Sequence, residues 1–184
     1  MKVSKILVSM AVIALSSSAF AGGGSDAQLI SKLKDSKITL LEGIRQAEQA
    51  SGPVTSAKFE LDDNGNLSLS IYTAPQGLQT PAEANELTEL SGDPTVAPFA
   101  PQAEIFKDKE HIARASVHLT LMQISKLTLS QIIQQAMRVE SGVPYSVANP
   151  EVRKGEPVAD VFLVQRSGNT EKVTINMRTG QVVR

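Results

Sequence analysis

Two stretches of this 184-residue chain, residues 36–52 and 125–142, place apolar residues at helical spacing. The apolar positions three or four residues apart are Leu40, Ile44 and Ala47 in the first stretch and Leu129, Ile132, Ile133 and Ala136 in the second. Residues at this spacing share one face of an α-helix. Each stretch is therefore predicted to form a helix with one side packed on a sheet.

Both predicted helices begin and end with the same residue types. Thr39 is followed three residues later by Glu42, and Thr128 by Gln131, which is the pairing of a capping box. In this box the hydroxyl accepts a bond from the first turn, and the Glu or Gln side chain accepts one from the cap's own N–H. A Ser-Gly pair then ends each stretch, where a glycine can take the left-handed conformation that closes a helix. The two closing glycines are Gly52 and Gly142.

The two stretches also share sequence. Aligned from Ser36 and Ser125, they agree at Ser, Lys, Thr, Leu, Ile, Gln and Ala positions. Convergence of two ordinary amphipathic helices is the alternative, but the shared caps and the shared ending favour a duplication. A repeated unit of this size buries little apolar surface alone, so the two copies are expected to pack together or share a sheet.

Alternation of apolar and polar residues predicts a β-hairpin after the first helix. Residues 57–61 and 67–72 alternate in this way and form two half-buried strands in this interpretation. The Asn64-Gly65 pair between them suits a tight turn, because both residue types tolerate positive φ angles.

Further strands are expected from the same alternation. Residues 113–122 alternate and predict a third strand that runs directly into the second helix. After an interruption at 144–148, which contains Pro144, strands are predicted at 158–166 and 173–178, with a closing edge at 182–183.

Two shorter helices are also predicted. Residues 26–34 carry an amphipathic pattern that leads into the first copy, and Thr80-Pro81 begins the other helix with Glu83 completing the box. In that second helix Glu83, Glu86 and Glu89 share one face. Such a cluster could hold a cation, but a solvated helix face is the favoured interpretation.

The resulting organisation has four parts and one insertion. Residues 1–21 are a leader, 22–35 a flexible segment with a short helix, 36–124 the first repeat and 125–184 the second. The first repeat contains a proline-rich insertion at 75–104. The predicted fold class is α+β, with two repeated units that each pack a helix on an antiparallel sheet.

The first 21 residues have the features of a secretory signal. Lys2 and Lys5 precede an apolar run at 6–15, and small residues end in Ala19-Phe20-Ala21. The apolar run is short for a membrane span, so cleavage is favoured over an uncleaved anchor. The chain contains no cysteine to carry a lipid anchor. We therefore expect a soluble periplasmic protein with no integral membrane segment after cleavage.

Charge and composition argue against several classes of function. Removing the two leader lysines from 18 basic residues leaves 16 against 19 acidic residues, a net charge of −3. Nucleic acid is an unsuitable partner for such a surface, because phosphate binding calls for a basic surplus. The absence of Trp and the low aromatic content, 4%, argue against a stacking platform for sugars or bases.

The sequence contains no organised set of catalytic or metal-ligating residues. His111 and His118 are the only histidines, and neither has an acidic partner at metal-ligand spacing. The acidic loop 62–66 lacks the alternating ligands and closing Glu of a calcium loop. We therefore predict that the protein is not an enzyme and holds neither a metal nor another cofactor.

The Thr-capped helices and the stretch Val173-Thr174-Ile175-Asn176-Met177-Arg178-Thr179-Gly180-Gln181-Val182 resemble the PepSY domain family. This family occurs in exported bacterial proteins and in propeptides of thermolysin-type metalloproteases. Asn176 stands where the family often has Asp, and the first copy lacks a Thr-Gly ending after Leu121. The resemblance covers most of residues 36–183 and implies a helix laid across an antiparallel sheet.

The resemblance also implies a function, namely binding of a protein or peptide partner and restraint or regulation of a peptidase. A sheet face or an edge strand would accept the partner segment, and the candidate edges are Val182-Val183 and the strand around His118. The alternatives are an envelope sensor or structural accessory, or a carrier of a small apolar ligand between the two repeats. The binding residues and the oligomeric state stay open at this point.

Overall fold

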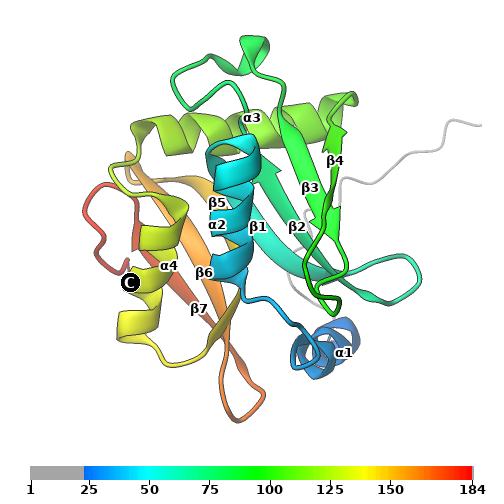
Figure 1. Cartoon of the computed structure of the whole chain (residues 1–184). Coiled ribbons are helices and arrows are strands. Elements are labelled where there is room, and N and C mark those ends of the chain that lie inside the picture. The colour runs from blue at the N-terminus through cyan, green and yellow to red at the C-terminus, as the bar shows by residue number, and fades with distance from the viewer. Residues whose placement is uncertain (1–22, 184) are drawn as a thin grey trace, which may run out of the picture.

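The computed structural model describes residues 23–183, without the side chains of residues 23–25, 82 and 149–151. These residues form a mixed α+β protein with four α-helices and one antiparallel sheet of seven strands (Figure 1). The elements in chain order are α1 (Gly23–Leu33), α2 (Leu40–Ser51), β1 (Val54–Leu61), β2 (Leu67–Thr73), the 3-10 turn η1 (Ala82–Ala84), β3 (Thr88–Gly92), β4 (Gln102–Ile105), α3 (Lys109–Ile124), α4 (Leu129–Val139), β5 (Val143–Arg153), β6 (Glu156–Val164) and β7 (Thr170–Asn176).

The sheet has the strand order β4-β3-β2-β1-β5-β6-β7. The strands that follow α2, β1 to β4, form one half of the sheet, and the strands that follow α4, β5 to β7, form the other half. Strands β1 and β5 join the two groups at the centre, where Ala57 pairs with Val147 and Lys58 with Ser146. The hydrogen-bonded sheet is therefore continuous across the molecule.

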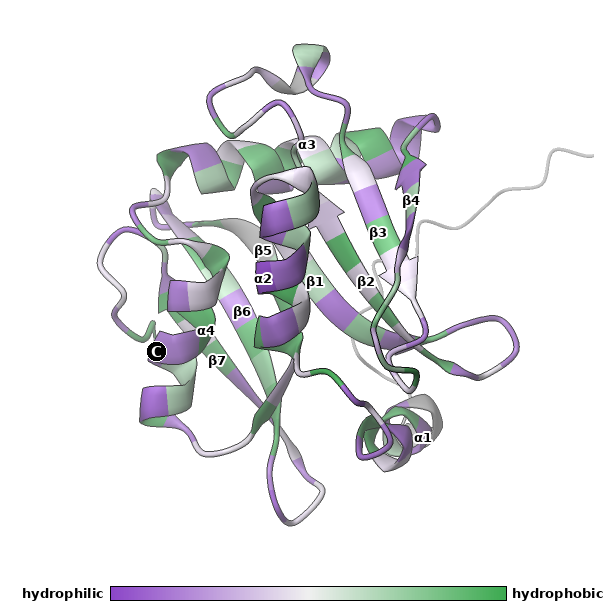
Figure 2. Cartoon of the chain, viewed as in Figure 1, coloured by the Kyte–Doolittle hydropathy of each residue, from purple (hydrophilic) through white to green (hydrophobic). Residues whose placement is uncertain are grey.

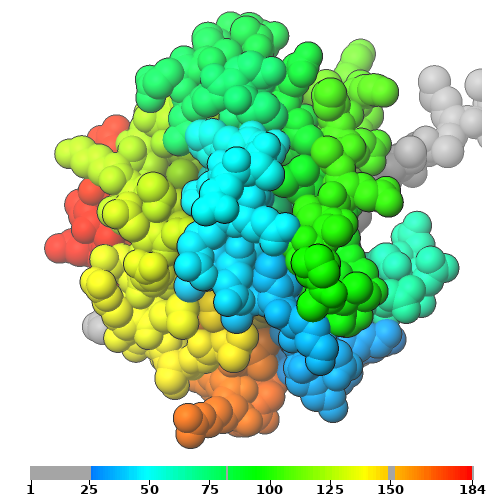
Figure 3. All heavy atoms as spheres, viewed as in Figure 1, coloured from blue at the N-terminus to red at the C-terminus, as the bar shows by residue number. Residues whose placement is uncertain are grey.

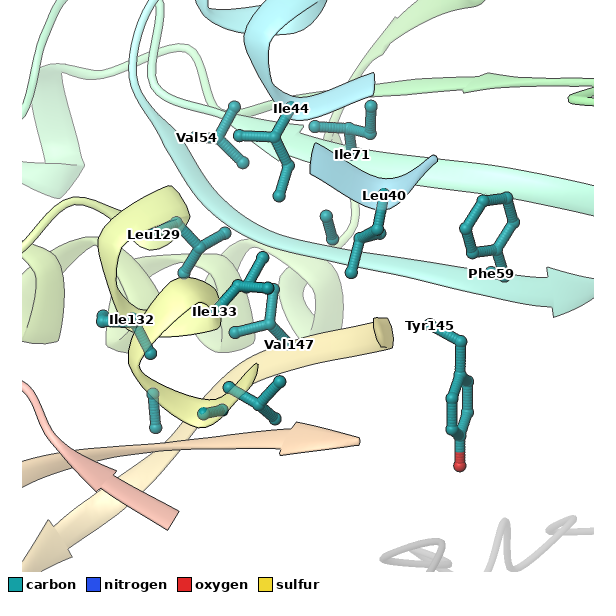
Figure 4. Close-up of a cluster of buried hydrophobic side chains, with 14 of the residues drawn as sticks. Leu40, Ile44, Val54, Phe59, Ile71, Leu129, Ile132, Ile133, Tyr145 and Val147 are labelled. Atoms are coloured by element: carbon teal, nitrogen blue, oxygen red, sulfur yellow. The ribbon is translucent and has the colours of Figure 1, made fainter. Parts of the chain in front are cut away.

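Helices α2 and α4 pack side by side on one face of this sheet (Figure 1). Their apolar stripes and the facing strand residues form the main core, which Figure 4 shows in close-up. Figure 2 shows hydrophilic residues on the outer side of both helices. The fully buried larger side chains of the helices are Leu40, Ile44, Leu129, Ile132 and Ile133. Burying each such side chain contributes about 1.5–3 kcal/mol, so this layer holds much of the fold's stability.

Both capping boxes predicted from sequence are present. The Glu42 side chain accepts from the Thr39 N–H at 2.9 Å, and the Glu42 N–H donates to the Thr39 hydroxyl at 3.2 Å. Thr128 and Gln131 make the equivalent pair at 2.9 and 3.2 Å. Each helix start is therefore satisfied by its own sequence, without help from another element.

The helix endings agree with the prediction only in part. Gly52 ends α2 with a positive φ angle of 95°, which glycine favours, although its ψ angle of −168° lies outside the predicted left-handed helical region; its N–H donates to the Glu48 carbonyl at 3.3 Å. α4 instead ends at Val139 with Glu140 as its cap, so the prediction for Gly142 was wrong. A Cβ at Gly142 would lie 2.9 Å from the Val164 carbonyl oxygen, which shows that Gly142 allows close approach of the neighbouring strand.

The opposite face of the sheet is covered at one end by α3. The Ala115 and Leu119 side chains of α3 form a small apolar cluster with Ala74 and Leu87. At its C-terminal end α3 reaches the main core through Leu121 and Met122. The C-terminal end of α3 therefore reaches the face of the sheet that α2 and α4 cover.

The prediction of a strand at 113–122 was wrong, because these residues lie within α3. Asp108 caps the helix, since its carboxylate accepts from the His111 N–H at 3.0 Å. The apparent alternation has three separate causes. Leu119 packs in the small cluster on the α3 face, Leu121 packs in the main core, and Val117 is exposed. A period of two is therefore coincidental here.

The helix predicted from Thr80 is also wrong. Only the single turn η1 forms, and Glu89 lies in strand β3. The three glutamates 83, 86 and 89 therefore share no helix face. Residues 75–104, expected as an insertion, supply β3 and β4 to the sheet.

The segment 144–148, expected as an interruption, belongs to the central strand β5. Pro144 sits near the strand's start, and the register shifts between Pro144 and Ser146. Proline is tolerated at such a bulge, because the ladder hydrogen bond it cannot donate is absent there.

The remaining local predictions agree with the structure. The 57–61 and 67–72 hairpin forms, although only Gly65 of the Asn-Gly pair has a positive φ angle, 76°. α1 covers the predicted 26–34 helix but begins at Gly23, so residues 23–25 are helical rather than a flexible leader. Strands β6 and β7 match the two predicted late strands.

The predicted signal sequence, residues 1–21, lies outside the described residues. Within residues 23–183, no helix combines the length and hydrophobicity that crossing a bilayer requires.

Candidate functional site

A hollow of about 210 Å³ lies where the C-terminal end of α2 meets the segment between α3 and α4. We call it the helix-junction hollow and define it by the residues that line it: Glu48, Pro53, Val54, Leu78, Met122, Ser125, Lys126, Leu127, Thr128 and Leu129. In Figure 3 these elements meet beside the upper end of α2, which is cyan. The wall therefore combines residues far apart in sequence.

One wall is the four-residue linker between α3 and α4. The Ser125 hydroxyl lies 2.7 Å from the Leu127 carbonyl and 3.0 Å from the Met177 carbonyl. The Lys126 N–H donates to the same Met177 carbonyl at 3.0 Å. These bonds hold the linker against the end of β7, so this wall is ordered by backbone contacts.

The opposite wall is the turn after strand β2. The Asn85 side-chain amide donates to the Gly77 carbonyl at 2.9 Å, and the Ala74 N–H donates to the Pro53 carbonyl at 2.9 Å. The Gln123 amide of α3 donates to the Thr80 carbonyl at 3.2 Å. Leu78 is carried on this tethered turn, half-buried at the rim of the hollow.

The lining is mainly apolar, with one acidic and one basic side chain. Burial raises the pKa of the Glu48 carboxyl above its usual range. Within residues 23–183 this carboxylate makes no hydrogen bond or ion pair. Lys126 is exposed on the linker side. The helix-junction hollow can therefore receive an apolar group and still offers a carboxylate that favours a cationic or N–H-bearing neighbour.

The two histidines do not form a site together. His111 is exposed, and its Nδ1 lies 2.7 Å from the Asp108 carboxylate, while its ring stacks on Phe106 at 5.2 Å. His118 is largely buried, and its Nδ1 lies 3.1 Å from the Ser56 hydroxyl. Seven residues of helix separate them by about 10 Å along the axis. No shared ion can bridge that distance.

Burial and, secondarily, the nearby Arg114 guanidinium lower the pKa of His118 to about 4. The ring is therefore neutral near pH 7. Its Ser56 contact and its burial place the ring between α3 and the sheet.

The acidic loop between β1 and β2 is stabilised by its own backbone. The Asp62 carboxylate accepts from the Asn64 N–H at 2.9 Å and from the Asn66 N–H at 2.7 Å. These bonds hold the pKa of Asp62 below its usual range. Within residues 23–183 no cluster of three or more His, Asp or Glu side chains is placed to hold a metal ion.

The sheet face beyond α3 is polar, and several of its charged side chains form pairs. Lys58 forms an ion pair with Glu60, which also accepts from the Ser70 hydroxyl at 2.6 Å. Asp160, on β6, accepts from Thr174 at 2.5 Å and pairs with a lysine of β7 at 3.1 Å. The hydroxyl and charged groups in these two clusters therefore satisfy each other.

The edges of the sheet give little room for an added strand. The Val183 N–H donates to the Thr174 carbonyl at 2.8 Å, and Val182 bridges to Ile175, so the C-terminal segment occupies part of the β7 edge. The strand expected around His118 is a helix and offers no edge. β4, the other outer strand, has four exposed residues, and short edges of this kind resist pairing.

Sequence reasoning identified none of the helix-junction hollow's lining as a site. Glu48 and Leu78 lie in different elements, and the linker residue Lys126 has no motif around it. The one signal available was the predicted junction of two equivalent helices, since ligand sites occur between packed helices.

No known family model matches the chain, and no curated protein matches it. Among solved structures, the chain is similar to a crystal structure described as a "putative lipoprotein" from Clostridium difficile 630. The sequence identity is 12% and the TM-score 0.42, and the alignment covers 81% of this chain and 92% of that one.

Proposed function

We propose that the protein is an exported, non-enzymatic binding module of the PepSY type. In this proposal it takes an apolar side chain of a protein partner into the helix-junction hollow, and the partner is a peptidase that the module restrains. The observation that carries the proposal is the hollow itself, with apolar walls and the unpaired Glu48 carboxylate.

The size of the hollow favours a side chain over a larger ligand. Pockets for drug-sized molecules and cofactors measure roughly 300–1,000 Å³, whereas this one measures about 210 Å³. A leucine-sized or phenylalanine-sized group fits such a space. Glu48 at the rim would then pair with a basic residue or a backbone N–H of the same partner segment.

Support for two related units comes from the order of elements. α2 is followed by four antiparallel strands, β1 to β4, and α4 is followed by three, β5 to β7. Both helices start with a complete capping box. Support for export comes from the signal-like residues 1–21 in the sequence.

A capture experiment with a filled hollow tests this function. The mature chain, residues 22–184, would be immobilised and exposed to native periplasmic extract, and captured peptidases would be assayed for inhibition. Leu78→Trp places a large ring at the rim of the hollow. The matched control is Gln79→Trp, because Gln79 is the next residue in the chain and is exposed. We expect stoichiometric inhibition by the wild-type chain and by Gln79→Trp, and loss of capture with Leu78→Trp. Capture that survives in Leu78→Trp, or no peptidase in the captured set, would refute the proposal.

The same hollow supports a second candidate, a carrier of a small apolar ligand. An unfilled space between the two helices is the feature that such a carrier requires. Native mass spectrometry of the purified mature chain distinguishes the two functions. A bound small molecule that is lost in Leu78→Trp supports the carrier, and an empty chain supports the protein-binding module.

A further inference from the structure

α3 exposes an apolar stripe along its outer side. Ala113, Val117, Thr120 and Ile124 are all exposed and stand four, three and four residues apart. This spacing places them on one face of the helix, as in the seam of a coiled coil. Val117 is 51% exposed and Ile124 is 40% exposed.

This stripe contrasts with the outer side of α2. The exposed positions there are Glu42, Arg45, Gln46, Gln49 and the small Ala50, and no large apolar side chain is among them. An exposed helix face ordinarily carries such residues, because apolar ones gain nothing from water. The apolar outer side of α3 therefore indicates a surface that another molecule covers.

We propose that this stripe pairs with the same stripe of a second copy of the chain, with the two α3 helices antiparallel about a twofold axis. The spacing is palindromic, because four, three and four reads the same in both directions. An antiparallel pair therefore sets Ala113 opposite Ile124 of the second copy, and Val117 opposite Thr120. The first contact joins a small side chain to a large one, and the second joins two β-branched side chains of nearly equal size, which allows close packing.

Charge selects the antiparallel orientation. Glu110 continues the stripe toward the start of α3, and Lys126 follows its end; both side chains are exposed. Each stands about eight residues from the centre of the stripe, so an antiparallel pair brings Glu110 near Lys126 of the second copy. A parallel pair would instead place like charges together, which is unfavourable. Antiparallel helices also set each N-terminus beside the other helix's C-terminus, where their dipoles attract.

The expected dimer is concentration-dependent. A helix of 16 residues is about 24 Å long, and one such contact covers less than the area of a standard stable interface. Association should therefore be visible as a shift between monomer and dimer rather than as a permanent assembly.

Light scattering and sedimentation of the mature chain, from dilute to concentrated solution, test this inference. We expect the mean mass to rise toward two copies, and Val117→Glu to hold the chain as a monomer. Val96→Glu is the matched control, because Val96 is 56% exposed in a loop away from α3, and it should dimerise normally. Glu110→Lys and Lys126→Glu should each weaken dimerisation, and the double variant should recover it.

Disulfide trapping checks the orientation, since the chain has no cysteine of its own. Mixing Ala113→Cys with Ile124→Cys should give the mixed disulfide, whereas Ala113→Cys alone should give little. A wild-type chain that stays monomeric at every concentration overturns the inference. Dimerisation that Val117→Glu leaves unchanged, or trapping only of Ala113→Cys with itself, does so as well. Circular dichroism verifies that each variant is folded.

Discussion

The two faces of the sheet are covered in different ways. On one face α2 and α4 pack apolar stripes against Leu, Ile and Val side chains; α2 keeps polar residues outside, whereas α4 exposes Met137 and Val139 at its C-terminal end. On the other face α3 contacts the sheet through a small apolar cluster and a His118–Ser56 contact, and it exposes apolar residues outside. The helices of the first face could be predicted from their apolar spacing and caps. The packing of α3 depends on contacts with elements that are distant in sequence.

A second difference separates α2 from α4 within the well-packed face. Position 43 in α2 is glycine, and the aligned position in α4 is Ile132. A Cβ at Gly43 would lie 2.7 Å from Leu69 Cδ2 and 3.2 Å from Ile71 Cδ1. α2 therefore lies closer to its strands than α4 does at the equivalent position. Helices with matching caps and spacing thus use different packing distances.

The largest expected effect comes from breaking the α4 layer. Ile132→Ala should lower the free energy of unfolding by about 2–5 kcal/mol, because Ile132 is fully buried and a cavity would remain. Val117→Ala, on the exposed side of α3, is the control in dilute solution, where the chain is a monomer, and should change this free energy by less than about 0.5 kcal/mol. Urea denaturation followed by circular dichroism measures both. Equal losses in the two variants would contradict the contrast between the faces.

The buried histidine of the α3 face should make stability depend on pH. The folded-state pKa of His118 is about 4, below its ordinary value of 6.5, so the unfolded chain binds the proton first. The stabilisation is therefore complete above pH 6.5 and is lost as pH falls from 6.5 toward 4, by up to about 3 kcal/mol.

The measurement for this effect is unfolding free energy against pH for wild type and His118→Gln. The difference between the two curves isolates His118 from the carboxyl groups that titrate in the same range. A wild-type curve parallel to that of His118→Gln between pH 4 and 6.5 would show that His118 is not held neutral by the fold.

A smaller effect sharpens the contrast between α2 and α4. Gly43→Ala improves helix propensity by about 1 kcal/mol, but overpacking against Leu69 and Ile71 costs about 1–3 kcal/mol. We expect a net loss of about 1 kcal/mol in urea denaturation. Ser130→Ala, at a half-buried position of α4, provides the comparison. A gain of stability in Gly43→Ala would mean that α2 moves away from the sheet without cost.

The smallest effects concern the N-cap residues of α2, α3 and α4. The stability lost on substituting the cap should be the same in each of these helices. Thr39→Ala, Thr128→Ala and Asp108→Ala each remove a side chain that accepts from the first turn, and each should cost about 1 kcal/mol. Thermal unfolding of the three variants is the measurement. A cap substitution in one helix that costs nothing would show that its start is held by tertiary contacts instead.

Much of the well-packed face could be predicted, and much of the candidate site could not. The capping boxes and apolar spacings of α2 and α4 are local, so their residues predict the helices without further knowledge. The hairpin with Gly65 is local for the same reason. The helix-junction hollow needs Glu48, Leu78 and Lys126 to meet, and no pattern in sequence records that meeting.

By itself, the sequence determined the two capped helices, the first hairpin and the late strands, because short-range hydrogen bonds and periodic burial specify them. Only the tertiary structure decided that residues 109–124 are helical and that 143–153 form a central strand. In both segments the apolar residues find their partners on elements distant in sequence. The apolar pattern there reflects two sets of neighbours at once, so its local period does not identify the element.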